Sequence, residues 1–275
     1  MKQKTNVLIY YNSLRSYLLY NQILKNNPKL FEYVIEIPST PYSSKTKKTN
    51  YKKLFKTLIE SPQFVIFQGL IIYLYSFLSN LCNCSIKDIC IKKNIQHIYC
   101  DKFDNNIISF LNKNKPSWII SSTSVILSKR FLSIPKLGVI NFHEAPVPSY
   151  RGSAGYIWNL VNDEKETWVS VFYVDEGLDS GDVIRFGNKI RIDSNKSVFT
   201  LWLKMFKSYN NIWHYIIPFL YKKVKIPSFK QSKTNISTYS YPTKDAMKIL
   251  KRKKINLLTF NDLLYIIKVS ITGNT

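Results

Sequence analysis

Short apolar runs alternate with amphipathic stretches along the first two thirds of the chain. The runs that predict strands are NVLIYYN (6–12), FEYVIEIP (31–38), IQHIYC (95–100), SWIISST (117–123), GVINFH (138–143) and WVSVFYV (168–174). Between them, SYLLYNQILKNN (16–27) and DNNIISFLNKN (104–114) have helical spacing. Strands alternating with helices predict an α/β fold with a doubly wound, mostly parallel, Rossmann-like sheet. Ligands of such sheets sit beyond the carboxyl ends of the strands.

A long insertion interrupts this alternation between the second and third predicted strands, at about residues 55–92. Its centre, FVIFQGLIIYLYSFLSNL (64–81), carries no charge and approaches the ~20 residues that span a bilayer. A helical stripe is formed by Phe67, Leu70, Ile71, Leu74, Phe77, Leu78 and Leu81. A spanning helix here would separate the two halves of one sheet. A helix buried in the protein or at a homodimer contact is therefore favoured over an interfacial membrane helix, and spanning is least favoured.

The remaining pattern predicts a helical tail. The stretch SVFTLWLKMFKSYNNIWHYIIPFLYKKV (197–224) predicts a long helix, and STYSYPTKDAMKILKRKKINLLTFNDLLYII (237–267) predicts a turn and two short helices. We expect an α/β domain over residues 1–195, which contains the apolar insertion, and a C-terminal helical extension over residues 196–275.

The composition adds a large positive charge. The formal net charge of +23 would suit partners rich in phosphate. However, only six of the 40 basic residues are arginine, whose planar fork suits phosphate and base recognition. We therefore interpret the lysines as a solvated basic face, near anionic lipid or a nucleotide-linked substrate, and a dedicated nucleic-acid surface is not favoured.

The cysteines and the N-terminus indicate a cytoplasmic protein. Cys82, Cys84, Cys90 and Cys100 lack paired C-x-x-C spacing and a histidine that could complete a zinc site, so we expect reduced thiols and no metal. The start, MKQKTNVLIYYN, predicts a first strand without a signal-peptide cleavage site. Peripheral contact with the inner face of the membrane stays open.

The placement of glycine excludes two common nucleotide sites. Before Gly138 the chain has only Gly69, so neither a G-x-G-x-x-G turn nor a P-loop can follow the first strand. The later glycines flank two loops, NFHEAPVPSYRGSAG (141–155) and DEGLDSGD (175–182). Neither contains a G-x-S-x-G nucleophile elbow, and the prolines after His143 prevent a zinc-protease helix.

These two loops combine an amide, an imidazole and carboxylates. Such groups, without a nucleophile, suit the transfer of an acyl group to an external amine. An imidazole can take the proton of the attacking amine, an amide can stabilise the developing oxyanion, and a carboxylate can fix the tautomer of the imidazole and support its cation. We assign these roles to His143, Asn141 and Asp179, respectively.

The joint pattern resembles one enzyme family. An N-x-H motif, a proline-containing loop that ends in YRG, the following YIWNL, and VDEGLDSGDVI are similar to the 10-formyltetrahydrofolate-dependent formyltransferases. The resemblance is good over residues 116–191 and loose over the N-terminal strands. It implies a catalytic set of Asn141, His143 and Asp179, with 10-formyltetrahydrofolate as co-substrate and no metal.

The resemblance also implies binding residues. The folate is expected along the loop after the fourth strand and along the aspartate loop, at Ser122, Val125, Ile126, Val174, Asp175 and Gly177. Candidates for contact with the amine substrate are Tyr150, Arg151 and Trp158. The sequence departs from the family pattern at Glu144 and Ala145, beside the amine pocket.

The residues after the long predicted helix indicate which amine substrate is favoured. The tRNA-modifying branch of the family has a C-terminal β-barrel, for which the roughly fifty residues after the long predicted helix are too few. The motif Y-S-Y-P-T with a short helix and a D-L-x-x-I ending resembles the tail of sugar N-formyltransferases of surface polysaccharide synthesis. We therefore favour a nucleotide-linked amino deoxysugar. The alternatives are a methionyl-tRNA formyltransferase-like enzyme and a non-catalytic, basic, membrane-apposed binding protein.

Overall fold

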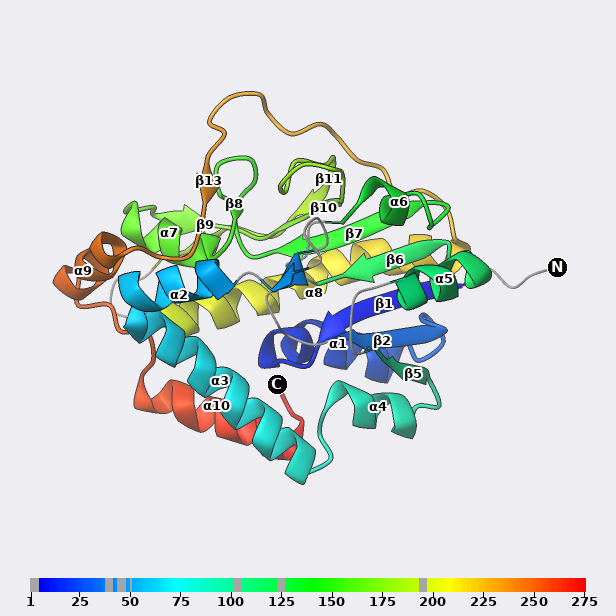
Figure 1. The fold of residues 1–275 in the computed structure, drawn as a ribbon, viewed down its shortest axis with the longest axis horizontal. Coiled ribbons are helices and arrows are strands. Elements are labelled where there is room, and N and C mark those ends of the chain that lie inside the picture. The colour runs from blue at the N-terminus through cyan, green and yellow to red at the C-terminus, as the bar shows by residue number, and fades with distance from the viewer. Residues whose placement is uncertain are drawn as a thin grey trace.

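A seven-stranded sheet forms the centre of the molecule (Figure 1). The computed structural model describes residues 5–37, 42–43, 48–49, 51–100, 105–122, 127–192 and 197–275. The strand order is β11-β10-β7-β6-β1-β2-β5. These strands are β1 (Asn6–Tyr11), β2 (Tyr33–Ile37), β5 (Gln96–Tyr99), β6 (Trp118–Ser121), β7 (Gly138–His143), β10 (Ser170–Tyr173) and β11 (Val183–Phe186).

The sheet is parallel from β7 to β5, and two antiparallel strands complete one edge. Strand β10 runs antiparallel to β7, and β11 runs antiparallel to β10. The expected α/β class with a doubly wound, mostly parallel sheet is confirmed. Side chains that alternate along β1 enter two separate clusters, with Leu8 in one and Val7 in the other. Both faces of the sheet are therefore covered, which explains why its strands read as continuous apolar runs.

Ten helices surround the sheet in the described part of the chain, and short strand pairs join the loops. The helices are α1 (Leu14–Asn26), α2 (Tyr51–Glu60), α3 (Pro62–Leu81), α4 (Ile86–Lys92), α5 (Asn105–Asn114), α6 (Lys129–Leu132), α7 (Gly155–Val161), α8 (Val198–Lys222), α9 (Lys244–Arg252) and α10 (Phe260–Thr272). The short strands are β3 (Tyr42–Ser43), β4 (Lys48–Thr49), β8 (Arg151–Gly152), β9 (Glu166–Thr167), β12 (Ile190–Arg191) and β13 (Thr238–Tyr239).

Helix α8 packs into the same core as the sheet. The Trp213 ring of this helix stacks on Phe142 of β7 with 4.6 Å between centroids. Its indole N–H donates to the carbonyl oxygen of Leu19 in α1. The core therefore continues across the domain boundary expected at residues 195 and 196.

One carboxylate joins the beginnings of α8 and α10. Asp262 accepts hydrogen bonds from the hydroxyls of Ser197 and Thr259, which are the N-cap residues of the two helices. Helix α10 consequently folds back against the body of the protein, where it packs beside α3 (Figure 1). The two short helices expected after the turn are present as α9 and α10.

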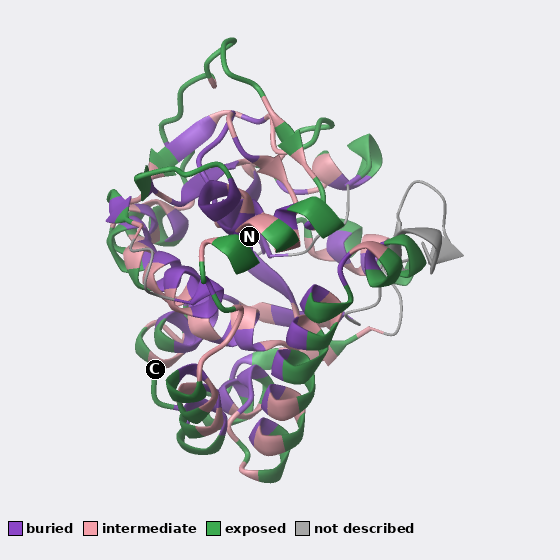
Figure 2. Ribbon diagram, turned by 90° about the vertical axis from the view of Figure 1, so that its left-hand side faces the viewer, coloured by how far each residue is buried: buried purple, intermediate pink, exposed green. Residues whose placement is uncertain are grey.

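The apolar insertion forms α2, α3 and α4, and the predicted stripe of α3 is only partly buried: Phe67 and Ile71 are buried and Leu74 packs against the core. The buried face of α3 consists of Phe64, Phe67, Ile71, Tyr75 and Ser79. From the predicted stripe, Leu70, Phe77 and Leu81 are instead exposed, by 39%, 55% and 68%. Apolar residues occur on every side of this helix, so periodicity alone could not select the inner face. In Figure 2, the strands are largely buried, whereas the surface helices carry many exposed residues.

Candidate active site

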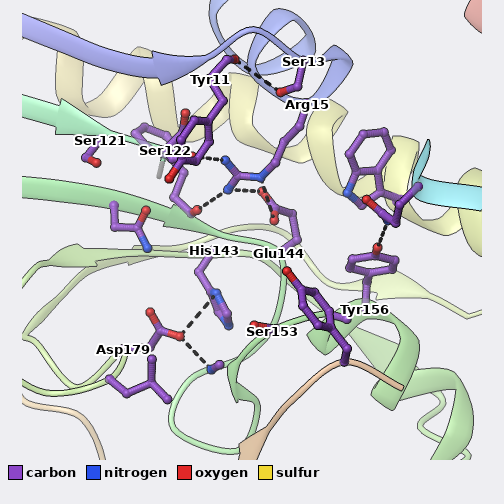
Figure 3. Close-up of a pocket in the computed structure, with 18 of the residues that line it drawn as sticks. Tyr11, Ser13, Arg15, Ser121, Ser122, His143, Glu144, Ser153, Tyr156 and Asp179 are labelled. Atoms are coloured by element: carbon purple, nitrogen blue, oxygen red, sulfur yellow. Dashed lines mark hydrogen bonds and ion pairs between the residues drawn. The ribbon is translucent and has the colours of Figure 1, made fainter. Parts of the chain in front are cut away.

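A pocket of about 340 Å³ opens at the carboxyl ends of β1, β6 and β7 (Figure 3). This is the position at which an open α/β sheet binds its ligands. The loop after β10 forms one side, and α3 forms another with Phe64, Phe67, Gln68, Ile71 and Ile72. Gln68 is fixed there because its amide donates to the hydroxyl of Tyr156, 3.1 Å away. The inserted helix is thus part of the pocket wall.

The pocket brings together the three predicted catalytic residues. Asn141, His143 and Asp179 all line it. Asn141 and His143 are two residues apart on β7, so they share one face of the sheet. Phe142 between them packs against Trp213 in the core. The alternation of the strand therefore aims the amide and the imidazole at the same space.

The imidazole of His143 is held between a carbonyl group and a carboxylate. Its Nε2 lies 2.7 Å from the carbonyl oxygen of Tyr150. Because a carbonyl can only accept, Nε2 carries a proton, and in the neutral ring Nδ1 is left with the lone pair. Nδ1 lies 3.8 Å from Oδ2 of Asp179, which is an electrostatic contact beyond hydrogen-bond length. The Tyr150 carbonyl, rather than the expected carboxylate, therefore fixes the tautomer.

Asp179 is positioned by its backbone and by the neighbouring loop. It adopts a left-handed conformation with φ of 48°. Its Oδ2 accepts a hydrogen bond from the backbone N–H of Gly152 at 2.7 Å, and its carbonyl oxygen accepts one from the side chain of Gln231. Gly152 itself has φ of 95°, and a Cβ there would lie 2.1 Å from the carbonyl oxygen of Tyr239. Only glycine fits at this point.

Arg15 and Glu144 form an ion pair in the pocket wall (Figure 3). The guanidinium lies 2.8 Å from Glu144 and also donates to the carbonyl oxygens of Ser122 and Phe142. Burial alone would lower the pKa of Arg15, but the charge and hydrogen bond of Glu144, together with Tyr209 and Tyr20, hold that pKa above its ordinary value. The cation therefore ties the ends of β6 and β7 together.

The sequence missed Arg15 and the residues of α3. The only indication for Arg15 in the sequence was that it is one of six arginines and lies soon after the first predicted strand. Gln68 was a polar residue inside an apolar run. Glu144 was recognised only as a departure from the family pattern, because its partner is distant in the sequence.

Four of the six residues predicted to bind the folate line the pocket. Ser122, Val174, Asp175 and Gly177 line the pocket. Oδ1 of Asp175 accepts hydrogen bonds from the Gly177 N–H and the Ser180 hydroxyl, which shapes the loop. Val125 and Ile126 lie outside the described residues.

The three predicted substrate residues do not line the pocket but hold the C-terminal segment. The ring of Tyr239 stacks between Tyr150 and Trp158, with centroids 5.1 and 4.9 Å away. The guanidinium of Arg151 donates to the side-chain oxygen of Gln231. This segment in turn brings Tyr241 to the pocket wall. These three side chains thus contact the segment around β13, which pairs with β8 along this loop, and their contact with the amine substrate stays a prediction.

Within the residues that the structure describes, no group of three histidine, cysteine, aspartate or glutamate side chains could hold a metal ion.

Comparison with known families identifies the central part of the chain. The profile described as formyl transferase matches residues 85–212, which contain Asn141, His143 and Asp179. Over residues 85–212, a little under half of its length, the chain is similar to the formyl transferase family. The matched formyl transferase region crosses from the sheet into α8, in agreement with the continuous core.

Among the relatives of this formyl transferase region are methionyl-tRNA formyltransferases. The Clostridium tetani enzyme is 36% identical over 126 residues, or 45% of this chain and 40% of that protein. The Clostridioides difficile enzyme is 37% identical over 122 residues, or 44% of this chain and 39% of that protein. The chain thus spans well under half the length of these relatives.

Solved formyltransferase structures share the fold over more of the chain. The N-formyltransferase from Helicobacter canadensis, in complex with folinic acid and dTDP-3-aminofucose, has a TM-score of 0.56 at 16% identity and covers 87% of this chain and 71% of that one. A sugar N-formyltransferase from Shewanella has a TM-score of 0.53 at 11% identity, covering 86% and 77%.

Proposed function

We propose that this chain transfers a formyl group from 10-formyltetrahydrofolate to a primary amine, with Asn141, His143 and Asp179 as the catalytic residues. The observation that carries the proposal is the meeting of an amide, an imidazole and a carboxylate in one pocket, inside the region that matches the formyl transferase family. The folate supplies an activated formyl group attached to nitrogen.

The geometry supports a specific route for the proton. As the amine nitrogen bonds to the formyl carbon, the carbonyl electrons move to oxygen, where the amide N–H of Asn141 can donate to the negative charge. Nδ1 of His143 is free to accept the proton of the amine, because Nε2 is engaged with Tyr150. The resulting imidazolium faces the Asp179 carboxylate. The carbon–nitrogen bond to the folate then breaks, and that nitrogen receives the proton from His143.

The pocket has the mixture of surfaces that a folate requires. Its lining combines apolar groups from Leu127, Phe172 and Val174 with the backbone and carboxylates of the loop after β10. An aromatic ring system with polar edges fits such a lining, since flat apolar walls hold the ring and a few polar groups orient it. Ser122, Val174, Asp175 and Gly177 are the residues we propose to hold it.

We propose a nucleotide-linked amino sugar as the amine substrate. Among the solved enzymes with this fold that cover most of the chain are an N-formyltransferase in complex with dTDP-3-aminofucose and a sugar N-formyltransferase. The large excess of lysine complements the negative charge of a nucleoside diphosphate. Such a reaction belongs in the cytoplasm, as one step in the synthesis of a surface polysaccharide.

Initiator tRNA is the second candidate. The sequence relatives named above are methionyl-tRNA formyltransferases, and their match covers the catalytic region. This region holds the groups common to formyl transfer, so it supports the reaction more directly than it supports a particular acceptor.

An acceptor panel tests both candidates. Purified protein is incubated with 10-formyltetrahydrofolate and either dTDP- and UDP-linked amino sugars or methionyl initiator tRNA, and tetrahydrofolate release is followed together with the mass of the product. We expect a gain of one formyl group on an amino sugar. Formylation of the tRNA alone would replace the first candidate by the second, and no turnover with any amine would overturn the proposed activity.

A further inference from the structure

The outer side of α3 is an apolar surface open to solvent. Ile66, Leu70, Tyr73, Phe77 and Leu81 are exposed by 67%, 39%, 65%, 55% and 68%. We call these residues the outer stripe. Their spacing of three or four residues places them in one line along the helix, about 22 Å long at 1.5 Å per residue. Contiguous exposed apolar surfaces of this kind mark contact with another molecule or a membrane.

Neighbouring helices extend the same apolar character. Helix α10, which packs beside α3, exposes Phe260, Leu264 and Ile271. An 18-residue stretch of the region from Pro62 to Lys92 has a mean hydropathy of 1.6, in the range of membrane helices, but only 28% of it is buried in the molecule. A core helix of the same hydropathy would be mostly buried.

The inner side of α3 rules out a spanning arrangement. Tyr75 is fully buried against the core, and Phe64 and Phe67 line the pocket. A helix that crossed a bilayer would have to leave these partners. The helix is therefore held against the protein along one side and open along the other, which is the geometry of an interfacial helix.

The charges around the outer stripe are positive. Exposed lysines lie on α4, which follows α3 in sequence, on the residue after α4, and on α10, which packs beside α3; we call Lys87, Lys92, Lys93 and Lys268 the bordering lysines. Asp88 and Asp262 cap their own helices, and on α2 the charges of Glu60 and Lys56 offset each other at 3.5 Å. A second copy of the chain would bring like charges together, whereas anionic headgroups would complement them.

We propose that the outer stripe of α3 docks on an anionic membrane surface, with its apolar side chains at the headgroup–acyl boundary and the bordering lysines on the lipid phosphates. The rings of Tyr73 and Phe77, stacked with centroids 6.0 Å apart, are the kind of side chains that concentrate at this boundary. This docking goes beyond formyl transfer and does not depend on it.

The docking also places the pocket beside the lipid. The inner side of the same helix forms part of the pocket wall. The pocket and the lipid surface are therefore separated by the thickness of a single helix, about 10 Å. An amine acceptor that is made or consumed at the membrane would therefore meet the pocket without leaving the membrane surface.

Vesicle co-sedimentation tests the docking. The full-length chain is mixed with phosphatidylglycerol–phosphatidylcholine vesicles and with phosphatidylcholine vesicles at low and high salt. We expect it to pellet with the anionic vesicles and to be released by salt. The variant Tyr73→Asp/Phe77→Asp should bind at least about tenfold more weakly, because its stripe carries two charges. The matched control, Val224→Asp/Ile236→Asp, makes the same charge change at exposed apolar residues elsewhere and should bind like the wild type.

Two further measurements keep the outcomes distinct. Circular dichroism and formyl transfer without lipid should be unchanged in both double variants, since neither alters the pocket lining. The proposal is overturned if the wild type ignores anionic vesicles or if Tyr73→Asp/Phe77→Asp binds them equally well. A wild-type dimer that this variant dissociates, without lipid binding, would assign the stripe to a second copy instead. Loss of formyl transfer in every assay would leave the vesicle result standing.

Discussion

His143 illustrates how a single backbone contact can decide which nitrogen of an imidazole is available for chemistry. Its Nε2 donates to the Tyr150 carbonyl, so the nitrogen that remains available for chemistry is Nδ1, on the side of Asp179. The loop that contains Tyr150 thus contributes through its main chain, although its side chains point to the C-terminal segment. A base and the carboxylate that stabilises its cation are thereby assembled from two loops.

We expect His143→Ala to lower kcat by about a hundredfold or more, because the amine then loses the group that accepts its proton. Folate binding should change little, since the ring is expected on other side chains and on the backbone. Turnover assays and calorimetric titration with folinic acid measure the two effects. The control is His214→Ala on the exposed side of α8, which should behave like the wild type. Near-normal turnover in His143→Ala would remove the imidazole from the mechanism.

Asp179→Asn separates charge from hydrogen bonding at the second loop. The amide oxygen of asparagine can still accept from the Gly152 N–H, so the loop should keep its shape. The cation on His143 would lose its counter-charge, and we expect kcat to fall at least about tenfold at unchanged stability. Asp182→Asn on the same loop, whose carboxylate pairs with Lys230 at the surface, is the control. Equal activities for the two variants would contradict the assigned role.

Arg15→Ala should destabilise the protein by about 3 kcal/mol, because it leaves the Glu144 carboxylate unpaired in the pocket wall. Glu144→Gln should cost less, since Arg15 keeps its two carbonyl partners. Urea denaturation measures both. Arg130→Ala, at an exposed position of α6, should stay within about 0.5 kcal/mol of the wild type. An Arg15→Ala variant as stable as that control would show that the pair contributes nothing to folding.

Helix α3 carries two functions on two sides, and its register can be tested with two tyrosines. Tyr75 is fully buried, and Tyr73 is 65% exposed. We expect Tyr75→Ala to cost about 3 kcal/mol or more through the cavity it leaves, and Tyr73→Ala to stay within about 0.5 kcal/mol. Thermal and urea unfolding in the absence of lipid provide the comparison. Similar losses in both variants would mean that the helix is rotated or covered in solution.

The elements of the sheet were predictable because their patterns are local. The apolar runs around Val7, Ile35 and Ile119 are buried on both faces of the sheet, so length and composition were sufficient to predict strands there. The inner face of α3 was not predictable, since Leu70 and Ile71 are equally apolar and only the tertiary contacts distinguish them. Because apolar residues occur on all sides of this helix, its composition does not indicate which side faces the core.

The candidate site was predictable where chemistry and spacing coincide. Asn141 and His143 share a strand face, and the aspartate loop carries its own glycines, so the sequence indicated three residues that line one pocket. The contacts of Tyr150, Arg151 and Trp158 with the C-terminal segment were not foreseen, because their partners, Tyr239 and Gln231, are distant in sequence. The Arg15–Glu144 pair escaped prediction for the same reason.

For the whole molecule, the net charge of +23 predicts the behaviour towards nucleic acid. If the lysines form a general basic surface, binding to tRNA should be weak and should fall steeply as salt rises through the physiological range. Filter binding with initiator tRNA and with bulk tRNA at several salt concentrations measures this. We expect no preference between the two tRNAs. Tight binding that is selective for initiator tRNA at physiological salt would favour the second candidate function.

The pairing of β8 with β13 has a consequence for the newly made protein. Gly152, which donates to the Asp179 carboxylate, is held by Tyr239, and Arg151 by Ser237, so the finished loop depends on residues that follow the whole sheet in sequence. A ribosome adds those residues after all seven strands of the sheet have been synthesised. We expect a nascent chain to acquire its sheet early and yet stay inactive until this late strand emerges from the exit tunnel and docks.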